Sequence, residues 1–350
     1  PVMKNNFSVE QSELTKHKSN EELLLACRQQ IKLEPNNPEN YLALGKLLRQ
    51  DSNQLEEALE AYQKVINLTS SYNTLAYKGI TKVIKKAASI ATINQPPYEK
   101  IIFYAGIGGL CNRLRSLCSY LALRSFWDIP LFLCWYPEEA CNCYFYELFK
   151  PVCETISPQS ILQLFSSKNT SQILYVYVGI NAYKTYLKDN LDSETFRTEY
   201  LRFVRKIKLK SHLLQEIEEF RKHNFTENII GLHMRRTDLY PHIKSRFIES
   251  NFSDDEKFIS AIEREIANGC SKFFLATDNQ ETQNLINNKF PGKIISYCQT
   301  FDGENKRQTS VENALIDLYL LSNCKKIIGS YYSSFSEYAA DLGNIPLIYA

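Results

Sequence analysis

Apolar residues change their spacing near residue 94 of the chain. Between residues 20 and 93 they recur at helical spacing, as in Leu23, Cys27 and Ile31, and no segment there has the alternation of a strand. After Pro96 and Pro97 the pattern changes to short apolar runs that alternate with amphipathic helices. We therefore expect a helical segment followed by an α/β region.

The second part of the chain predicts apolar strands and helices in alternation. Strands are expected at residues 101–104, 131–135, 173–178, 229–233, 273–276, 294–297, 326–329 and 346–349. Helices are expected at residues 112–126, 193–207, 212–223, 254–268, 279–288, 311–322 and 334–342. This alternation is typical of an α/β fold with parallel, doubly wound sheets. The helical stretch from 193 to 223 separates two groups of strands, so we expect two Rossmann-like lobes with a cleft between them.

These patterns divide the chain into segments. The length of 350 residues agrees with two or three domains. The expected order is a polar tail at 1–19, a helical module at 20–93, a proline-containing linker at 94–99, a first lobe at 100–225 and a second lobe at 226–350. The two lobes would together form the larger part of the protein.

The helical module contains an imperfect repeat. Gly45 and Gly79 are 34 positions apart, and 34 residues is the length of a tetratricopeptide repeat, which packs two antiparallel helices around small residues. The match is incomplete because Lys78 stands where Leu44 would recur. About two and a half units fit, fewer than the three or so of a free-standing solenoid. The module is therefore either a protein-docking surface or a helical cap on the following domain.

Composition excludes several classes of protein. The 41 basic and 39 acidic residues give a net charge of +2, without the basic excess usual for nucleic-acid binding. No segment reaches the ~20 apolar residues of a membrane span. Residues 1–20 lack the apolar core of a secretory signal. The 10 cysteines are scattered without zinc-site spacing, so we expect reduced thiols, no metal site and a cytoplasmic location.

The first candidate site follows the first predicted strand. The turn from Gly106 to Gly109 is rich in glycine, but a dinucleotide-binding fingerprint would need glycine at position 111, which is Cys111. What remains is a tight turn whose backbone can approach a ligand. Asn112 and Arg113 then open a helix, where the helix dipole favours negative charge. The alternative is an Asn cap with a solvated arginine.

The second candidate site lies at the end of the strand 229–233. Arg235, Arg236 and Asp238 follow this strand closely. In an open α/β sheet this edge faces the ligand crevice, and two guanidinium groups there suit phosphate oxygens. Successive residues point to opposite sides, so one arginine is expected to face the ligand while Asp238 or the sheet holds the other. A structural network of arginine and aspartate is the alternative.

The third candidate site follows the strand 326–329. Ser333 and Ser334 open the next helix there, and serine hydroxyls with free helix N–H groups can bind an anion, although a plain helix cap is the alternative. Asp317 lies in the preceding, otherwise apolar helix. A carboxylate there needs hydrogen-bond donors, such as the N1–H and 2-amino groups of guanine, unless it is exposed at the surface.

Three segments together resemble the fucosyltransferase superfamily. They are GGLCNRL at residues 108–114, HMRRTD at 233–238 and SSFS at 333–336, in this order and spacing. The superfamily includes α1,2- and α1,6-fucosyltransferases, bacterial nodulation fucosyltransferases and protein O-fucosyltransferases. The resemblance covers about residues 100–350 and is strongest toward bacterial members similar to the α1,6 and nodulation enzymes, although SSFS also resembles the α1,2 group.

This resemblance implies a GT-B fold, GDP-β-L-fucose as donor, inversion at the anomeric carbon and no metal. It implies that Arg235 neutralises the β-phosphate, that Ser333 and Ser334 bind the diphosphate and that Asp317 binds guanine. His233 would lie beside the base or ribose through its backbone, and Asn112 and Arg113 would reach the sugar–phosphate bond across the cleft. The donor site is also expected to include Gly108, Gly109, Arg236 and Phe335. The chain contains no DxD triplet, so arginines would take the place of a metal ion.

The acceptor hydroxyl needs a general base. In the α1,6-type enzymes an acidic residue closely follows the RRTD segment, whereas LYPHIK at residues 239–244 has no carboxylate. The candidates are His242, which titrates near neutrality, Asp238, and a loop carboxylate such as Glu249, Asp254 or Asp255.

We therefore expect a cytoplasmic, metal-independent fucosyltransferase that has no cofactor besides its donor substrate. Its acceptor would be a glycan or a protein hydroxyl, and the helical module could bind a protein partner. One alternative is a GT-B transferase that uses another nucleotide sugar. Another is a tetratricopeptide scaffold with an inactive transferase-like domain, which the missing carboxylate favours.

Overall fold

The computed structural model describes residues 19–70, 72–167, 170, 172–179, 181–236, 252–297, 301 and 309–350. The chain forms two compact units. The helical unit comprises residues 1–98 and 156–174, and the α/β unit comprises residues 99–155 and 175–350. Among the helices in the described ranges, none is both long enough and apolar enough to cross a membrane.

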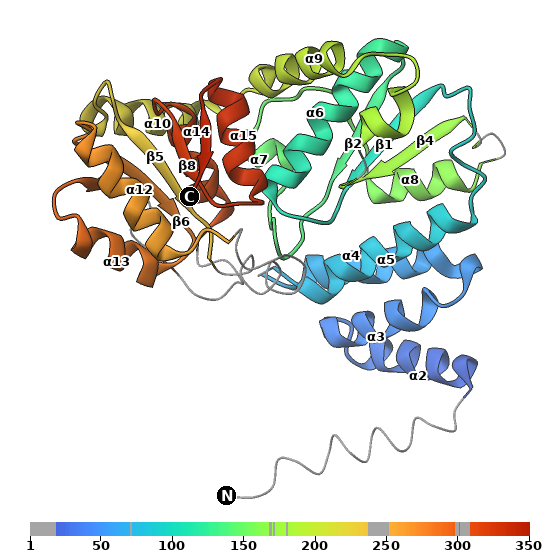
Figure 1. Cartoon of the computed structure of the whole chain (residues 1–350). Coiled ribbons are helices and arrows are strands. Elements are labelled where there is room, and N and C mark those ends of the chain that lie inside the picture. The colour runs from blue at the N-terminus through green and yellow to red at the C-terminus, as the bar shows by residue number, and fades with distance from the viewer. Residues whose placement is uncertain are drawn as a thin grey trace, which may run out of the picture. The chain divides into compact units, whose positions relative to one another are not determined.

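Consecutive helices form most of the helical unit (Figure 1). They are α2 (Asn20–Leu33), α3 (Pro38–Leu48), α4 (Leu55–Leu68) and α5 (Thr74–Ile90), with a short 3₁₀ turn, η2 (Ser52–Gln54), before α4. Local sequence determines where they start. Ser19 and Glu22 form a capping box at α2, and Asn37 caps α3 with Pro38 at its first position.

Tyr62 of α4 packs against both glycines of the imperfect repeat. A Cβ on Gly45 would lie 3.0 Å from the Tyr62 ring, and a Cβ on Gly79 would lie 2.4 Å from it. Side chains at these positions would push α3 and α5 away from the ring. The spacing of 34 residues therefore has a packing reason here, while the identity of these helices as tetratricopeptide repeats stays a prediction.

Helix α8 (Pro158–Phe165) belongs to the helical unit as well, where it packs against α4 and α5. Its apolar stripe includes the buried Ile161 and Leu162. From the sequence, residues 156–174 were expected in the first lobe. A helix of 8 residues has too few turns for its periodicity to show what it packs against.

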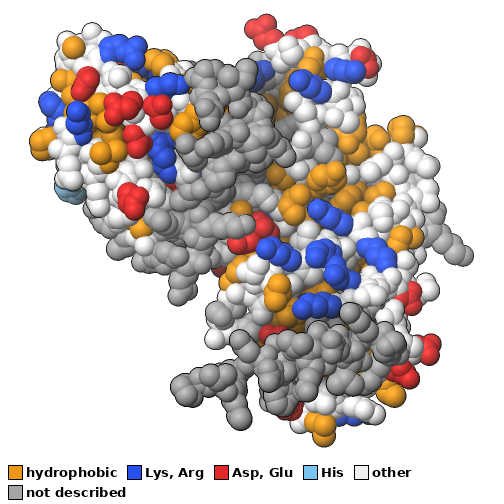
Figure 2. Space-filling model, turned by 60° about the horizontal axis from the view of Figure 1, so that its bottom comes forward, with side chains coloured by type: hydrophobic (Ala, Val, Ile, Leu, Met, Phe, Trp, Pro, Cys, Tyr) orange, Lys and Arg blue, Asp and Glu red, His pale blue; other side chains and the backbone are white. Residues whose placement is uncertain are grey.

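Basic side chains gather on the surface of the helical unit in the view of Figure 2. On α5, Lys78, Lys82 and Lys85 are exposed, and their helical spacing places them on one face. This face is therefore locally cationic, although the whole chain has a net charge of only +2.

The first sheet of the α/β unit has the strand order β3-β2-β1-β4. The strands are β1 (Lys100–Ala105), β2 (Leu131–Trp135), β3 (Glu154–Thr155) and β4 (Ile173–Tyr177). β2 pairs in parallel with both β1 and β3. The helices near this sheet are α6 (Leu110–Trp127), α7 (Phe145–Leu148) and α9 (Ser193–Lys206), with a π-helical turn, η3 (Tyr183–Leu187).

The second sheet has the order β7-β6-β5-β8-β9, and all its paired strands are parallel. The strands are β5 (Ile230–Met234), β6 (Phe273–Thr277), β7 (Ile294–Ile295), β8 (Ile327–Gly329) and β9 (Leu347–Tyr349). The helices of this part are α10 (Ser211–Asn224), α12 (Asp255–Ala267), α13 (Gln280–Lys289), α14 (Val311–Ser322) and α15 (Ser334–Gly343). Every residue of β5 and β6 is buried, which explains their continuous apolar sequence. The prediction of an α/β fold with parallel sheets is confirmed.

Helix α10 packs with the second sheet, although the sequence analysis counted it with the first lobe. It contacts α14, and the ring of Phe220 lies 6.2 Å from the ring of Phe274 on β6. An aromatic side chain on the apolar face of an amphipathic helix is free to pack on either lobe, so the sequence pattern does not select one. Helix α10 therefore packs with the strands of the second sheet, although it precedes β5 in the chain.

Each sheet has one point at which the strand order reverses. β1 lies between β2 and β4, and β5 lies between β6 and β8. Open α/β sheets bind ligands beyond the carboxyl ends of the strands at such a reversal point. The ends of β1 and β5 are therefore the places where this fold offers a site.

Candidate functional site

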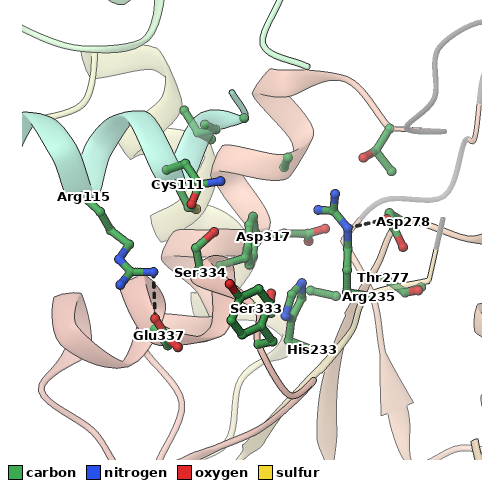
Figure 3. A pocket seen from close by; sticks show the side chains of 18 residues that line it. Cys111, Arg115, His233, Arg235, Thr277, Asp278, Asp317, Ser333, Ser334 and Glu337 are labelled. Atoms are coloured by element: carbon green, nitrogen blue, oxygen red, sulfur yellow. Dashed lines mark ion pairs between the residues drawn. The ribbon is translucent and has the colours of Figure 1, made fainter. Parts of the chain in front are cut away.

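A cavity of about 620 Å³ lies between the two sheets of the α/β unit (Figure 3). It is bordered by the first residues of α6 and by the segments after β5, β6 and β8. The predicted site residues that line it are Gly109, Asn112, His233, Arg235, Asp317, Ser333, Ser334 and Phe335. Tertiary structure thus brings all three sequence motifs to one cavity.

Two helices begin at this cavity without a side-chain cap. Gly109 precedes α6 and Ser333 precedes α15, and neither position makes a capping hydrogen bond through a side chain. Their first N–H groups therefore remain available to a ligand, and both helix dipoles place partial positive charge there. The Ser333 hydroxyl is not used as a helix cap, which removes the alternative interpretation of the serine pair.

Backbone conformation directs both helix starts toward the cavity. Gly108 has φ +79° and Tyr332 has φ +60°. A left-handed conformation is easy for glycine but costs about 1 kcal/mol for tyrosine. Tyr332 makes the tight turn that brings Ser333 into the cavity wall, with its own ring 52% exposed.

Arg235 is the arginine that lines the cavity. Its side chain is 15% exposed, and its Nε lies 2.9 Å from Oδ2 of Asp278, which follows β6 (Figure 3). The Ser330 hydroxyl, next to β8, accepts the backbone N–H of Arg235 at 2.9 Å. Asp278 after β6 thus orients the guanidinium and Ser330 after β8 fixes the backbone of Arg235, which is the preorganisation that anion binding requires.

Arg236 points away from the cavity. Its Nη2 and Nε donate to Oδ1 of Asp255 at 2.7 and 3.1 Å, and its Nη1 donates to the carbonyl oxygen of Ser253 at 3.1 Å. Its guanidinium carbon lies 5.4 Å from the centre of the Phe258 ring. Arg236 therefore does not contribute its side chain to the donor cavity. The prediction that Arg236 belongs to the donor site is therefore wrong for its side chain, and its acidic partner among the described residues is Asp255.

His233 is buried and uncharged. Its Nδ1 lies 2.7 Å from the Ser336 hydroxyl, and its ring stacks on Phe335 at 4.5 Å. Burial, with the nearby charges of Arg235 and Arg236, lowers the pKa of His233 to about 3. His233 therefore supports the cavity wall as a neutral ring and cannot carry positive charge near neutral pH.

Asp317 is a buried carboxyl that faces the cavity and is only 5% exposed. Its Oδ1 makes no hydrogen bond within the described structure. Burial raises its pKa well above the usual range. A buried acceptor without a donor is unfavourable by about 1–3 kcal/mol, so this position is suited to a ligand that supplies donors. Surface exposure, the alternative interpretation of Asp317, is wrong.

Arg113 does not reach the cavity, contrary to the prediction. Its side chain is fully buried, its Nε donates to the carbonyl oxygen of Gly108 at 2.7 Å, and its Nη1 donates to that of Tyr136 at 2.7 Å. The guanidinium also lies 5.2 Å from the Trp135 ring. Arg113 thus fixes the turn before α6. A helix periodicity cannot show this, since α6 is buried on most of its sides.

The remaining predicted residues lie elsewhere. Gly108 lines a second, adjoining cavity. Asp254 caps α12 and Asp255 pairs with Arg236, so neither loop carboxylate borders the donor cavity. The general-base candidates Asp238, His242 and Glu249 lie outside the described residues.

Sequence reasoning missed three charged residues of the cavity wall, namely Arg115, Asp278 and Glu337. Asp278 comes directly after β6, and this position at the end of a buried strand is a usable signal. Arg115 and Glu337 lie one helical turn beyond Asn112 and Ser334, so each shares the helix face of a motif residue. No group of three metal-ligating side chains occurs in the part of the chain that the structure describes.

Comparison with known proteins gives structural similarities only. No protein-family model and no curated protein matches the sequence. The structure is similar to NodZ α1,6-fucosyltransferase soaked with GDP-fucose, with 18% identity over 70% of this chain and 92% of that chain and a TM-score of 0.47. The fucosyltransferase NodZ from Bradyrhizobium matches with a TM-score of 0.46, 19% identity and coverage of 69% and 92%. POFUT1 in complex with GDP-fucose matches with a TM-score of 0.47, 12% identity and coverage of 73% and 99%.

Proposed function

We propose that the α/β unit is a GT-B glycosyltransferase that moves L-fucose from GDP-fucose to a hydroxyl group of a glycan or a protein, with inversion and without a metal ion. One observation carries this proposal. Arg235, two uncapped helix N-termini and the unpartnered carboxyl of Asp317 line a single cavity. Arg235 and the two helix N-termini suit a diphosphate, and the carboxyl of Asp317 suits a nucleobase with N–H donors.

The guanine would lie at Asp317. The N1–H and 2-amino groups of guanine can donate to the two oxygens of one carboxylate, whereas uracil and adenine do not present such a pair. The carboxyl must then be ionised. Because burial favours its protonated form in the free protein, binding of GDP is expected to release a proton.

The diphosphate would lie between Arg235 and the start of α15. Negative charge grows on the leaving phosphate as the sugar becomes oxocarbenium-like. Arg235, held by Asp278, and the hydroxyls of Ser333 and Ser334 would meet this charge. Fixed cationic groups in this place support a mechanism that uses no metal. Asn112 of α6 would contact the sugar–phosphate region from the other side of the cavity.

Calorimetry with GDP, UDP and ADP tests the nucleotide. GDP should bind most tightly and should release a proton, seen as a dependence of the binding enthalpy on the ionisation enthalpy of the buffer. Asp317→Asn should abolish that proton release. Tighter binding of UDP or ADP would instead favour a transferase with another nucleotide sugar.

A donor and acceptor screen with mass-spectrometric detection tests the reaction. Addition of a deoxyhexose mass to a glycan or peptide, with GDP formed in equal amount, is the expected result. Tight GDP binding without any transfer or GDP release would favour a scaffold with an inactive domain. In either case the helical unit, with its predicted repeats, remains the proposed protein-docking part.

A further inference from the structure

A second cavity adjoins the donor cavity in the α/β unit. Its volume is about 1180 Å³, and its wall includes Ile107 and Gly108 after β1 and Val178 and Gly179 after β4. These residues lie at the reversal point of the first sheet, where open α/β sheets bind ligands. The donor cavity lies by the reversal point of the second sheet, at His233 and Arg235, and it also borders the segment after β1, at Gly109 and Asn112.

The two cavities share one wall. Asn112 and Arg115 of α6 and Glu337 of α15 line both of them. Arg115 Nη1 and Glu337 Oε2 are 2.8 Å apart and join a helix of the first sheet to a helix of the second (Figure 3). A molecule in the second cavity would therefore meet the donor at this ion pair.

Only one carboxylate of the described donor-cavity wall is placed to take a proton. Asp278 and Glu337 each pair with an arginine, but the Asp278 side chain is only 9% exposed and also accepts the backbone N–H of Arg236. Asp317 is buried and suited to the nucleotide. Glu337 is 35% exposed and faces both cavities, so it can take up a proton and return it to water.

We propose that the second cavity binds the acceptor and that Glu337 is the general base that removes the proton from the acceptor hydroxyl. This role rests on the proposed fucosyl transfer. The acceptor oxygen attacks C1 of fucose and its proton passes to the Glu337 carboxylate. The bond between C1 and the β-phosphate oxygen breaks, and its electron pair leaves with GDP beside Arg235. Glu337 then gives the proton to solvent.

The surroundings of Glu337 keep its carboxylate oriented and accessible. Arg115 of α6 pairs with it, and Tyr349 of β9 donates its hydroxyl to Oε1 at 3.3 Å. Asp341, on the same helix, is paired with Arg197 of α9. Arg115 and Tyr349 thus hold the Glu337 carboxylate at the boundary of the two cavities.

GDP release from GDP-fucose, with water as acceptor, is the assay. Glu337→Gln and Glu337→Ala should each lower the rate by about 10²–10³, the usual contribution of a general base. Both variants should bind GDP with an affinity within twofold of the wild type. The matched control is Glu281→Gln, because Glu281 is exposed on α13. Its rate of GDP release and its affinity for GDP should both stay within twofold of the wild type. In the wild type the rate of GDP release should fall as pH is lowered (the acid limb of the pH profile). This fall should be absent in Glu337→Gln.

Sodium azide separates a base from a structural residue. Azide is an anionic nucleophile that needs no deprotonation, so it should restore GDP release and form fucosyl azide in Glu337→Ala but should not accelerate the wild type. A separate variant, Arg197→Ala, should raise the KM for a transferred acceptor and leave GDP affinity unchanged, because Arg197 lines only the second cavity.

Each part of the proposal has its own contrary result. If Glu337→Gln keeps its rate and its acid limb, or azide does not rescue Glu337→Ala, Glu337 is not the base. If Arg197→Ala weakens GDP binding but not acceptor KM, the second cavity is not the acceptor site. If the wild type binds GDP-fucose but never releases GDP, the proposed transfer itself is wrong and the role of Glu337 is wrong with it.

Discussion

Arg113 and Arg235 both follow an apolar parallel strand at the reversal point of a sheet, yet their surroundings are opposite. Arg113 is fully buried and donates to the carbonyl oxygens of Gly108 and Tyr136. Arg235 lines a cavity and is paired with one carboxylate, Asp278. The first arginine uses its donors to hold a loop, and the second places its guanidinium in the wall of the donor cavity.

This difference shows that an arginine in the segment after a strand is not by itself evidence of an anion site. What matters is where its guanidinium lies. Two backbone carbonyl oxygens hold Arg113 inside the fold, with Glu138 Oε2 4.0 Å from its Nη2, whereas Asp278 orients Arg235 at the cavity wall. Replacing Arg235 should therefore lower the rate of catalysis, whereas replacing Arg113 should lower the stability of the fold.

The largest effect is expected at Arg235. Arg235→Ala should lower kcat about 10³-fold, equivalent to about 4 kcal/mol of transition-state stabilisation, because the charge on leaving GDP loses its partner. Arg235→Lys should recover only part of this loss, since an ammonium group lacks the planar fork. Unfolding in urea should change little. An unchanged kcat in Arg235→Ala would remove the distinction between the two arginines.

A smaller effect, on stability, is expected at Arg113. Arg113→Met leaves two buried carbonyl oxygens without donors, so the free energy of unfolding should fall by about 3 kcal/mol. Urea unfolding measures this, with Arg264→Met as the control because Arg264 is exposed on α12. If Arg113→Met were as stable as the control but lost its donor affinity, Arg113 would belong to the site.

Asp317 is an acidic residue of the donor cavity, and its replacement tests whether guanine binds there. Asp317→Asn should weaken GDP binding by about 2 kcal/mol, because the amide has only one acceptor oxygen and leaves one of the two guanine N–H groups without a partner. The free energy of unfolding at neutral pH should rise, because burial opposes ionisation of this carboxyl in the folded state. Equal GDP affinity in the variant would mean that guanine lies elsewhere.

At neutral pH His233 gives the smallest effect on stability, and this effect grows as pH falls. The unfolded chain binds a proton at His233 below its ordinary pKa of 6.5, whereas the folded protein does so only near pKa 3. Folding stability should therefore fall as pH falls between these values, by about 1.4 kcal/mol per pH unit. His233→Gln should flatten this part of the curve, and His223→Gln, at an exposed position, should not. A curve for His233→Gln as steep as the wild type would show that His233 is not buried neutral.

Much of the fold could be predicted because its signals are local. The strand Leu131–Trp135 and the helix Val311–Ser322 have the predicted bounds, and most others differ by one or two residues. Exceptions are the shortest elements. β3 has 2 residues and α7 has 4, too few for any periodicity to appear, and they form because neighbouring strands and side chains hold them.

The amino-acid sequence by itself determined the order of strands and helices and the residues that follow each strand, among them Arg235 and Ser333. It did so because hydrophobic periodicity and turn residues act over a few positions. Tertiary structure alone decided that Arg113 is buried, that Asp278 orients Arg235 and that Arg115 meets Glu337 across two sheets. The direction and ionisation of a side chain depend on groups far away in the chain, and only packing brings those groups within a few ångströms.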